Sequence, residues 1–222
     1  MRQVLSIIVA GTENVTYLRE TAEAATRAAS VLRVEAELIV AVQSSHEEVA
    51  RHALAGLPYR LLSCAAEHVA AWNNAGAATA AGQILLFLQE GIILTADGLK
   101  ILMENLLLDE GVAAVGPFSN RTAYAWQYMN AETMAARGED AAAWVREHLT
   151  SPTESLFLED FALLMRRRVF DRVGGFDEAF ADGGADLDLS FRLKYERFHL
   201  LRAPVYLAHR HAEACDLYDL RR

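Results

Sequence analysis

Two aspartates, Asp186 and Asp188, follow a Gly183-Gly184 pair and open a segment whose apolar residues suggest a helix. A carboxylate held among apolar side chains can act as a general base, because burial disfavours its charged form and raises its pKa. The alternative is structural, since an aspartate in the first turn of a helix is stabilised by free backbone amides and by the helix dipole. Asp186 is therefore a candidate base, and a capping role stays open.

The elements around these aspartates must hold them in place. The apolar residues of the segment are expected to face a core, and they are Leu189, Phe191, Leu193 and Phe198. Arg192 follows Asp188 by four residues, a spacing at which helix side chains meet as a surface ion pair. We expect this structural role for Asp188.

A longer pattern surrounds the aspartates. From Arg167 the chain reads Arg-Arg-Val-Phe-Asp-Arg-Val-Gly-Gly-Phe-Asp-Glu-Ala-Phe, and from Gly184 it reads Gly-Ala-Asp-Leu-Asp-Leu-Ser-Phe-Arg. The order and spacing resemble the C-terminal half of family 2 glycosyltransferases, which are inverting enzymes with the GT-A fold. The resemblance implies a three-layer α/β/α sandwich with a mostly parallel central sheet, and it makes Asp186 the catalytic base. Ala185 departs from the pattern, because the family has glutamate there.

Composition narrows the classes of partner. The net charge is -9 over 222 residues and the pI is near 5.3, which argues against a nucleic-acid partner, because that would need clustered positive charge. No stretch approaches the ~20 apolar residues of a membrane span, so no integral membrane segment is expected. The two cysteines, Cys64 and Cys215, lie far apart without metal-ligand spacing. A reduced, cytoplasmic protein is the expectation.

The first half of the chain alternates strand and helix patterns. Apolar runs predict strands at 4–9, 37–42, 59–64, 84–88 and 112–115. Helical spacing predicts helices at 17–32, 46–55, 69–81 and 96–108. Such alternation is typical of right-handed βαβ units and a parallel sheet, in which ligands bind at the carboxyl ends of the strands.

The alternation stops at Gly116. Irregular chain is expected to follow, then a helix at 131–149 and strands at 158–165 and 205–208. We expect a single GT-A-like domain over 1–222. Residues 1–115 would form its nucleotide-sugar-binding half, and residues 116–222 its acceptor-binding and catalytic half.

The resemblance places the donor site in the first half, although the family's residues are not all present. Ala10, Thr12 and Glu13 stand near the family's Pro-X-Tyr-Asn segment, and Val42 stands where an aspartate reads the base. Asn74 matches an asparagine of the family's Ala-X-Asn-X-Gly segment. These five are the candidate donor-binding residues, together with two at the end of the fourth strand. For Asn74, the alternative that it does not bind the donor is equally open.

The fourth strand ends in Gln89-Glu90-Gly91, where the family has Asp-X-Asp or Asn-X-Asp. Those carboxylates reach a divalent cation that offsets the charge of the departing diphosphate. Gln89 and Glu90 remain candidate donor-binding residues, and Glu90 with His209 are candidate ligands for Mg²⁺ or Mn²⁺. Three alternatives stay open: Glu90 turns inward, His209 and the two aspartates hold the metal, or no metal binds.

The acceptor side has its own candidates. Asn120 lies in a segment that, in the family, lines the sugar pocket, and Trp126 belongs to an alternating aromatic run that could stack on a sugar or pack as a half-buried strand. Asp188 is the third acceptor-binding candidate, beside its surface-pair alternative.

These observations lead to two main hypotheses. The first is an inverting glycosyltransferase that uses a nucleotide-diphosphate sugar and a hydroxyl acceptor on a glycan, a lipid-linked carrier or a protein. The second is a catalytically impaired protein of the same fold that binds sugar or nucleotide, or acts as a scaffold. A homodimer is possible in either case. A dinucleotide-dependent oxidoreductase is disfavoured, because no Gly-X-Gly-X-X-Gly follows the first strand.

Overall fold

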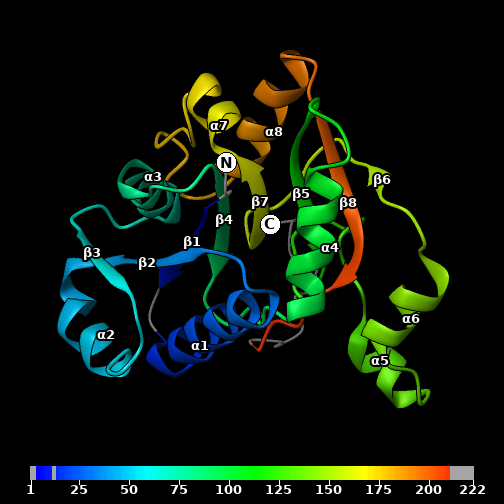
Figure 1. The fold of residues 1–222 in the computed structure, drawn as a ribbon, viewed down its shortest axis with the longest axis horizontal. Helices are drawn as coiled ribbons and strands as arrows, with labels where there is room; N and C mark the ends of the chain where they lie inside the picture. Colours follow the sequence, from blue (N-terminus) through cyan, green and yellow to red (C-terminus); the bar gives the residue numbers. More distant parts are fainter. Residues whose placement is uncertain (1–3, 12–13, 211–222) are drawn as a thin grey trace.

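The apolar runs of the sequence lie side by side in one central sheet (Figure 1). This computed structural model describes residues 4–11 and 14–210. Within them, the strands follow the order β3-β2-β1-β4-β7-β5-β8-β6. The strands are β1 (Leu5–Gly11), β2 (Ala36–Gln43), β3 (Arg60–Cys64), β4 (Ile84–Gln89), β5 (Val112–Phe118), β6 (Thr153–Glu154), β7 (Ala162–Arg166) and β8 (His199–Tyr206).

The sheet is mostly parallel, as predicted. The pairs β1–β2, β1–β4, β2–β3 and β5–β8 are parallel. Strand β7 runs antiparallel between β4 and β5, and the short β6 runs antiparallel to β8. The start of β7 therefore lies at the edge of the sheet where its antiparallel neighbour β4 ends.

Helices cover both faces of the sheet (Figure 1). They are α1 (Val15–Leu32), α2 (Glu47–Ala53), α3 (Val69–Thr79), α4 (Ala96–Leu106), α5 (Ala131–Ala136), α6 (Ala141–His148), α7 (Arg167–Val173) and α8 (Ala185–Tyr195), with a 3₁₀ turn, η1 (Ser44–His46). Side chains of α1, α2 and α4 pack in one buried cluster, and those of α3, α7 and α8 pack in another. The α/β/α sandwich is confirmed.

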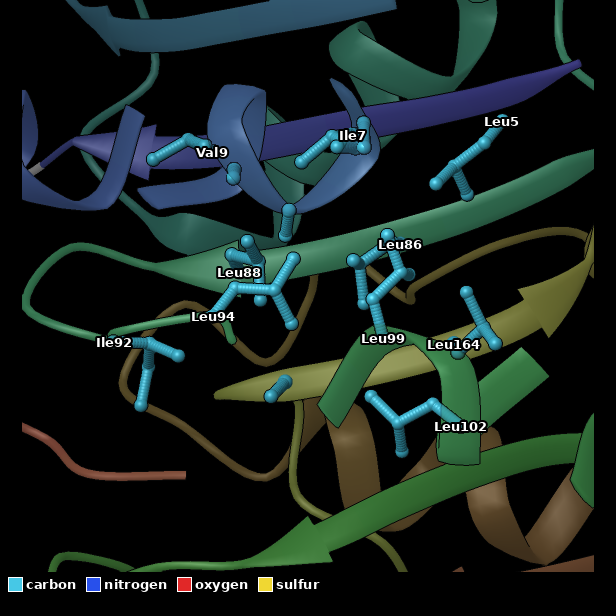
Figure 2. Close-up of a cluster of buried hydrophobic side chains, with 14 of the residues drawn as sticks. Leu5, Ile7, Val9, Leu86, Leu88, Ile92, Leu94, Leu99, Leu102 and Leu164 are labelled. Atoms are coloured by element: carbon cyan, nitrogen blue, oxygen red, sulfur yellow. The ribbon is translucent and has the colours of Figure 1, made fainter. Parts of the chain in front are cut away.

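The two clusters follow from strand geometry, since successive side chains of a strand point to opposite faces. In β1, Leu5, Ile7 and Val9 belong to the first cluster, whereas Ile8 belongs to the second. Figure 2 shows the first cluster, with side chains of β1 and β4 gathered beside those of α4. Both faces of β1 are therefore buried, which explains its continuous apolar run.

Several predicted boundaries of helices and strands are wrong. The helix expected at 131–149 is two helices, and Gly138 between them adopts a positive φ of 76°. Strand β5 continues past Gly116 to Phe118, and β8 begins at His199 rather than near 205. Strand β7 begins only at Ala162, four residues later than predicted.

One core prediction is also wrong. Leu189 and Leu193 are each 1% exposed, but Phe191 is 57% exposed. On a helix, residues four apart share a face, whereas a residue between them points to the other side. Phe191 therefore cannot join its two neighbours in the core.

Candidate active site

A cavity of about 1190 Å³ opens at the carboxyl ends of the parallel strands. Asn14 follows β1 at this edge, while Gln43 and Gln89 end β2 and β4, and all three line the cavity. The cavity is also lined by the loop after β5, the residues before β7 and the start of α8. Clefts of this size and place hold ligands in α/β folds.

Asp186 lies in the wall of this cavity as the second residue of α8. The preceding Gly183 and Gly184 have φ values of 116° and 90°, which favour glycine, and they turn the chain into the helix. The N-cap of α8 is Gly184 and not Asp186, so the alternative in which Asp186 caps the helix is wrong. Its Oδ1 instead accepts a hydrogen bond from its neighbour Leu187 N at 2.8 Å. Asp186 is 9% exposed, and this burial raises the pKa of its carboxyl.

Two further carboxyl groups, Glu159 and Asp160, line the cavity just before β7. Asp160 accepts hydrogen bonds from Gln89 Nε2 at 2.8 Å and from Asn73 Nδ2 at 3.3 Å. Burial, with the nearby charges of Asp186 and Glu159, raises the pKa of Asp160 from 3.8 to about 7. Burial likewise raises the pKa of Glu159 from 4.5 to about 7. The site thus gathers three carboxyl groups whose charged forms disfavour one another.

Glu159 and Asp160 were not predicted from the sequence, because the apolar run of 158–165 placed both inside a strand. Two adjacent carboxylates at the head of an apolar run were a usable signal, since a buried strand rarely holds unpaired charge. The antiparallel direction of β7 was also needed, because it places the start of that strand beside the end of β4.

Comparison with known proteins now identifies the family. A sequence profile of glycosyltransferase-like family 2 matches residues 6–219. The chain belongs to glycosyltransferase-like family 2. A comparison with curated proteins finds no match.

Solved glycosyltransferases share the fold of this family 2 chain. A mannosyltransferase from Pyrobaculum calidifontis, solved with GDP-Man and Mn²⁺, superposes with a TM-score of 0.69 at 16% identity over 97% of this chain. This chain spans 59% of the length of that mannosyltransferase. Glucosyl-3-phosphoglycerate synthase from Mycobacterium tuberculosis, solved with Mn²⁺, UDP and glucosyl-3-phosphoglycerate, gives 0.60 at 17% identity, covering 94% of this chain and 72% of that one. At such identities the likeness shows the fold, which is GT-A.

The predicted donor-binding residues lie in different environments. Ala10 and Val42 are each 1% exposed in the core, so their side chains are not among those that line the cavity. Thr12 and Glu13 lie outside the described residues. Gln89 and Glu90 do line the cavity.

Asn74 has a structural position in the family 2 chain, away from the cavity lining. Its Nδ2 donates to Phe176 O at 2.8 Å and to Glu178 Oε1 at 2.9 Å, and its Oδ1 accepts from Phe176 N at 3.0 Å. These bonds fasten α3 to the turn at Gly175. The side chain therefore supports the loop that leads to α8.

The end of β4 does not form a metal site by itself. The Gln89 amide donates to Asp160, and Glu90 Oε1 accepts from Asn14 N at 3.2 Å. Gly91 has a φ of 92°, and a Cβ built on it would lie 2.8 Å from the His209 ring. Glu90 and His209 both line the cavity, but the part of the chain that the structure describes contains no group of three or more His, Cys, Asp or Glu residues able to hold a metal ion.

The three acceptor candidates, Asn120, Trp126 and Asp188, are not among the residues that line the cavity. Asn120 Nδ2 donates to His209 O at 3.0 Å, and Asn120 Oδ1 accepts from His209 N at 2.7 Å, so Asn120 fixes the chain after β8. Trp126 is 39% exposed and stacks on Tyr124, which lines the cavity. Asp188 pairs with Arg192 at 2.6 Å, which confirms the surface pair.

Among residues 4–11 and 14–210, no helix has the length and apolar character to cross a bilayer.

The raised carboxyl pKa values predict a dependence of stability on pH. The folded protein keeps protons on Glu159 and Asp160 up to a pH of about 7, whereas the unfolded chain loses them near 4.5 and 3.8. Between these values the folded state binds more protons, so the free energy of unfolding falls as pH rises towards about 7 and then levels off. Urea midpoints at about pH 5 and about pH 8 measure this fall. Asp160→Asn should reduce the difference between the two midpoints, because the variant lacks one of the two groups. An equal difference in the variant and the parent would contradict the raised pKa of Asp160.

Proposed function

We propose that this chain transfers a sugar from a nucleotide-diphosphate donor to a hydroxyl acceptor, with inversion, and that Asp186 is the general base. One observation carries the proposal: Asp186 is only 9% exposed and lines a large cavity at the carboxyl ends of the strands. The family match and the GT-A fold support the reaction class.

Asp186 would take the proton of the acceptor hydroxyl as the oxygen attacks the anomeric carbon. The new oxygen–carbon bond forms while the bond from that carbon to the diphosphate oxygen breaks, and the diphosphate leaves with the electron pair. Burial raises the pKa of Asp186, which makes it a stronger base than an exposed aspartate. A positioned base of this kind typically contributes about 10²–10⁴-fold to the rate.

We assign the donor to the half of the cavity formed by residues 1–115 and the acceptor to the half formed by residues 116–222. Gln43, Gln89 and Glu90 belong to the first of these halves and Tyr124 to the second, and all four line the cavity. We place Trp126 beside the acceptor, since its ring stacks on Tyr124. A cytoplasmic location remains our proposal, supported by the low cysteine content.

A divalent cation, if bound with the donor, would offset the charge of the diphosphate. The mannosyltransferase and the synthase described above were solved with Mn²⁺. Because the residues at the end of β4 do not fit a protein-only metal site, we derive no step of the reaction through a metal.

The test is a transfer assay with purified protein, a panel of UDP- and GDP-sugars and simple hydroxyl acceptors, with and without Mn²⁺. Release of nucleoside diphosphate that depends on both substrates, with an inverted product linkage, is the expected result. The alternative, a binding protein without transfer, is favoured by the departures at Gln89 and Gly91. Calorimetry separates the two: saturable donor binding without turnover under any condition would support the binding protein.

A further inference from the structure

Two aromatic side chains stand on the exposed face of α8. Phe191 is 57% exposed and Tyr195 is 88% exposed. They are four residues apart, so they share one face of the helix, and both line a surface hollow of about 660 Å³. The core contacts of α8 are made instead by Leu189 and Leu193, which are each 1% exposed. Large apolar groups gathered at one place on a surface are a mark of binding sites.

A chain of ring contacts joins this face of α8 to the cavity of the candidate active site. Phe191 meets Phe157 with ring centroids 4.7 Å apart, and Phe157 meets Trp126 at 5.9 Å. Trp126 stacks on Tyr124 at 5.0 Å with the planes 11° from parallel, and Tyr124 lines the cavity. The aromatic track that leads from the cavity to the surface of α8 thus consists of Tyr124, Trp126, Phe157, Phe191 and Tyr195.

The middle of the aromatic track is held by hydrogen bonds. Trp126 Nε1 donates to Phe157 O at 3.0 Å, and the guanidinium of Arg202 donates to Trp126 O. Trp126 nevertheless remains 39% exposed, so part of its surface is free for a ligand. Because these rings are already fixed, a ligand that stacks on them loses little affinity to the ordering of side chains.

Charged side chains also line the hollow beside the track, and they occur in ion pairs. The pairs are Arg172–Glu196, Arg192–Asp188 and Lys194–Glu154. Because each positive group has a negative partner, the hollow offers little net charge to an anionic lipid surface. The paired groups can donate to and accept from hydroxyl groups, whereas an alkyl chain laid over them would remove water without replacing its hydrogen bonds. The hollow therefore favours a ligand that combines flat apolar faces with many hydroxyl groups, which is the chemistry of a sugar chain.

We propose that the aromatic track binds an oligosaccharide acceptor, with its terminal sugar in the cavity beside Tyr124 and the preceding sugars along Trp126, Phe157 and Phe191. The inference rests on the proposed function, because it names the class of acceptor for that reaction: a chain of several sugars rather than a single sugar or a lipid carrier. Stacking uses the C–H face of a sugar ring, which most sugars share. The track therefore selects for the length of the acceptor more than for the identity of each sugar.

The test is calorimetry, in the absence of donor, with gluco-, manno- and galacto-oligosaccharides of one and of six sugars. At least one hexasaccharide should bind about tenfold tighter than its monosaccharide, and Phe191→Ala should abolish this gain and leave monosaccharide binding unchanged. Val31→Ala is the matched control, because Val31 is 64% exposed on α1, which packs on the other face of the sheet. It should bind every sugar as the parent does. Failure of every hexasaccharide to bind, or equal binding by the parent and Phe191→Ala, would overturn the proposal.

Two further measurements test other occupants of the aromatic track. Sedimentation with phosphatidylcholine vesicles tests for a membrane surface, and light scattering tests for a second copy of the chain. The parent should neither sediment with the vesicles through Phe191 nor form a dimer through it. Vesicle binding, or a dimer, that is lost in Phe191→Ala would overturn the proposal.

The binding measurement also keeps this inference separate from the reaction itself. Because it needs no donor, hexasaccharide binding that depends on Phe191 would support the track even if the parent transferred no sugar and the proposed function failed. Where transfer occurs, Phe191→Ala should raise the KM for a hexasaccharide acceptor about tenfold with kcat unchanged, and it should leave the KM for a monosaccharide acceptor as in the parent. Equal KM values for the hexasaccharide in parent and variant would contradict the track.

Discussion

Asp186→Asn is expected to lower kcat for sugar transfer by about 10²–10⁴-fold, because the amide cannot accept the proton of the attacking hydroxyl. The amide has nearly the same shape as the carboxyl, and its oxygen can still accept from Leu187 N. Donor binding should therefore persist, and the donor KM should change little. Steady-state kinetics and calorimetry with the donor measure the two effects separately.

A matched control separates catalysis from helix capping. Asp97 is the second residue of α4, as Asp186 is of α8, and both are acidic groups in a first helical turn. Asp97 is exposed, and removal of its charge costs only about 0.3–1 kcal/mol of helix-dipole stabilisation. Asp97→Asn should therefore change stability little and keep full transfer activity. If Asp186→Asn turned over donor as fast as Asp97→Asn, the assignment of the base would be wrong.

The base candidate could be found from the sequence because its signal is local. Gly183, Gly184 and Asp186 are close in the chain, and the glycines have the positive φ values that the turn requires. The alternation of strands and helices was equally local, and it predicted the parallel pairing of β1 to β4 correctly. Both predictions depend on neighbours in sequence rather than on the packing of distant segments.

The rest of the site depends on contacts between distant segments. Asp160 meets Gln89 across 71 residues, and Asn74 meets Phe176 across 102. No periodicity predicts that the start of an antiparallel β7 lies beside the end of β4. For the same reason Asn74 could be matched to a family position, but its hydrogen bonds to the turn after α7 could not be foreseen.

The chain that leads into α8, and so to Asp186, depends in turn on an aromatic cluster. Phe87 of β4 is 0% exposed, and its ring centroid lies 5.2 Å from those of both Phe170 and Phe176. Phe176 is also the residue whose backbone Asn74 holds. The cluster therefore joins the central sheet to α7 and to the chain that leads into α8.

Phe87→Ala is expected to lower the free energy of unfolding by about 3–5 kcal/mol, through lost burial and the cavity left behind. Domains of this kind are stable by only about 5–15 kcal/mol, so the loss is a large part of the total. Urea unfolding of parent and variant measures it as a lower midpoint at an unchanged slope. The matched control is Phe191→Ala, because Phe191 is 57% exposed and its ring lies 4.7 Å from that of Phe157. That change should cost less than about 1 kcal/mol. Equal losses in the two variants would contradict this prediction. They would mean that neighbouring side chains fill the space left by Phe87, and that this ring does not join the sheet to the chain before α8.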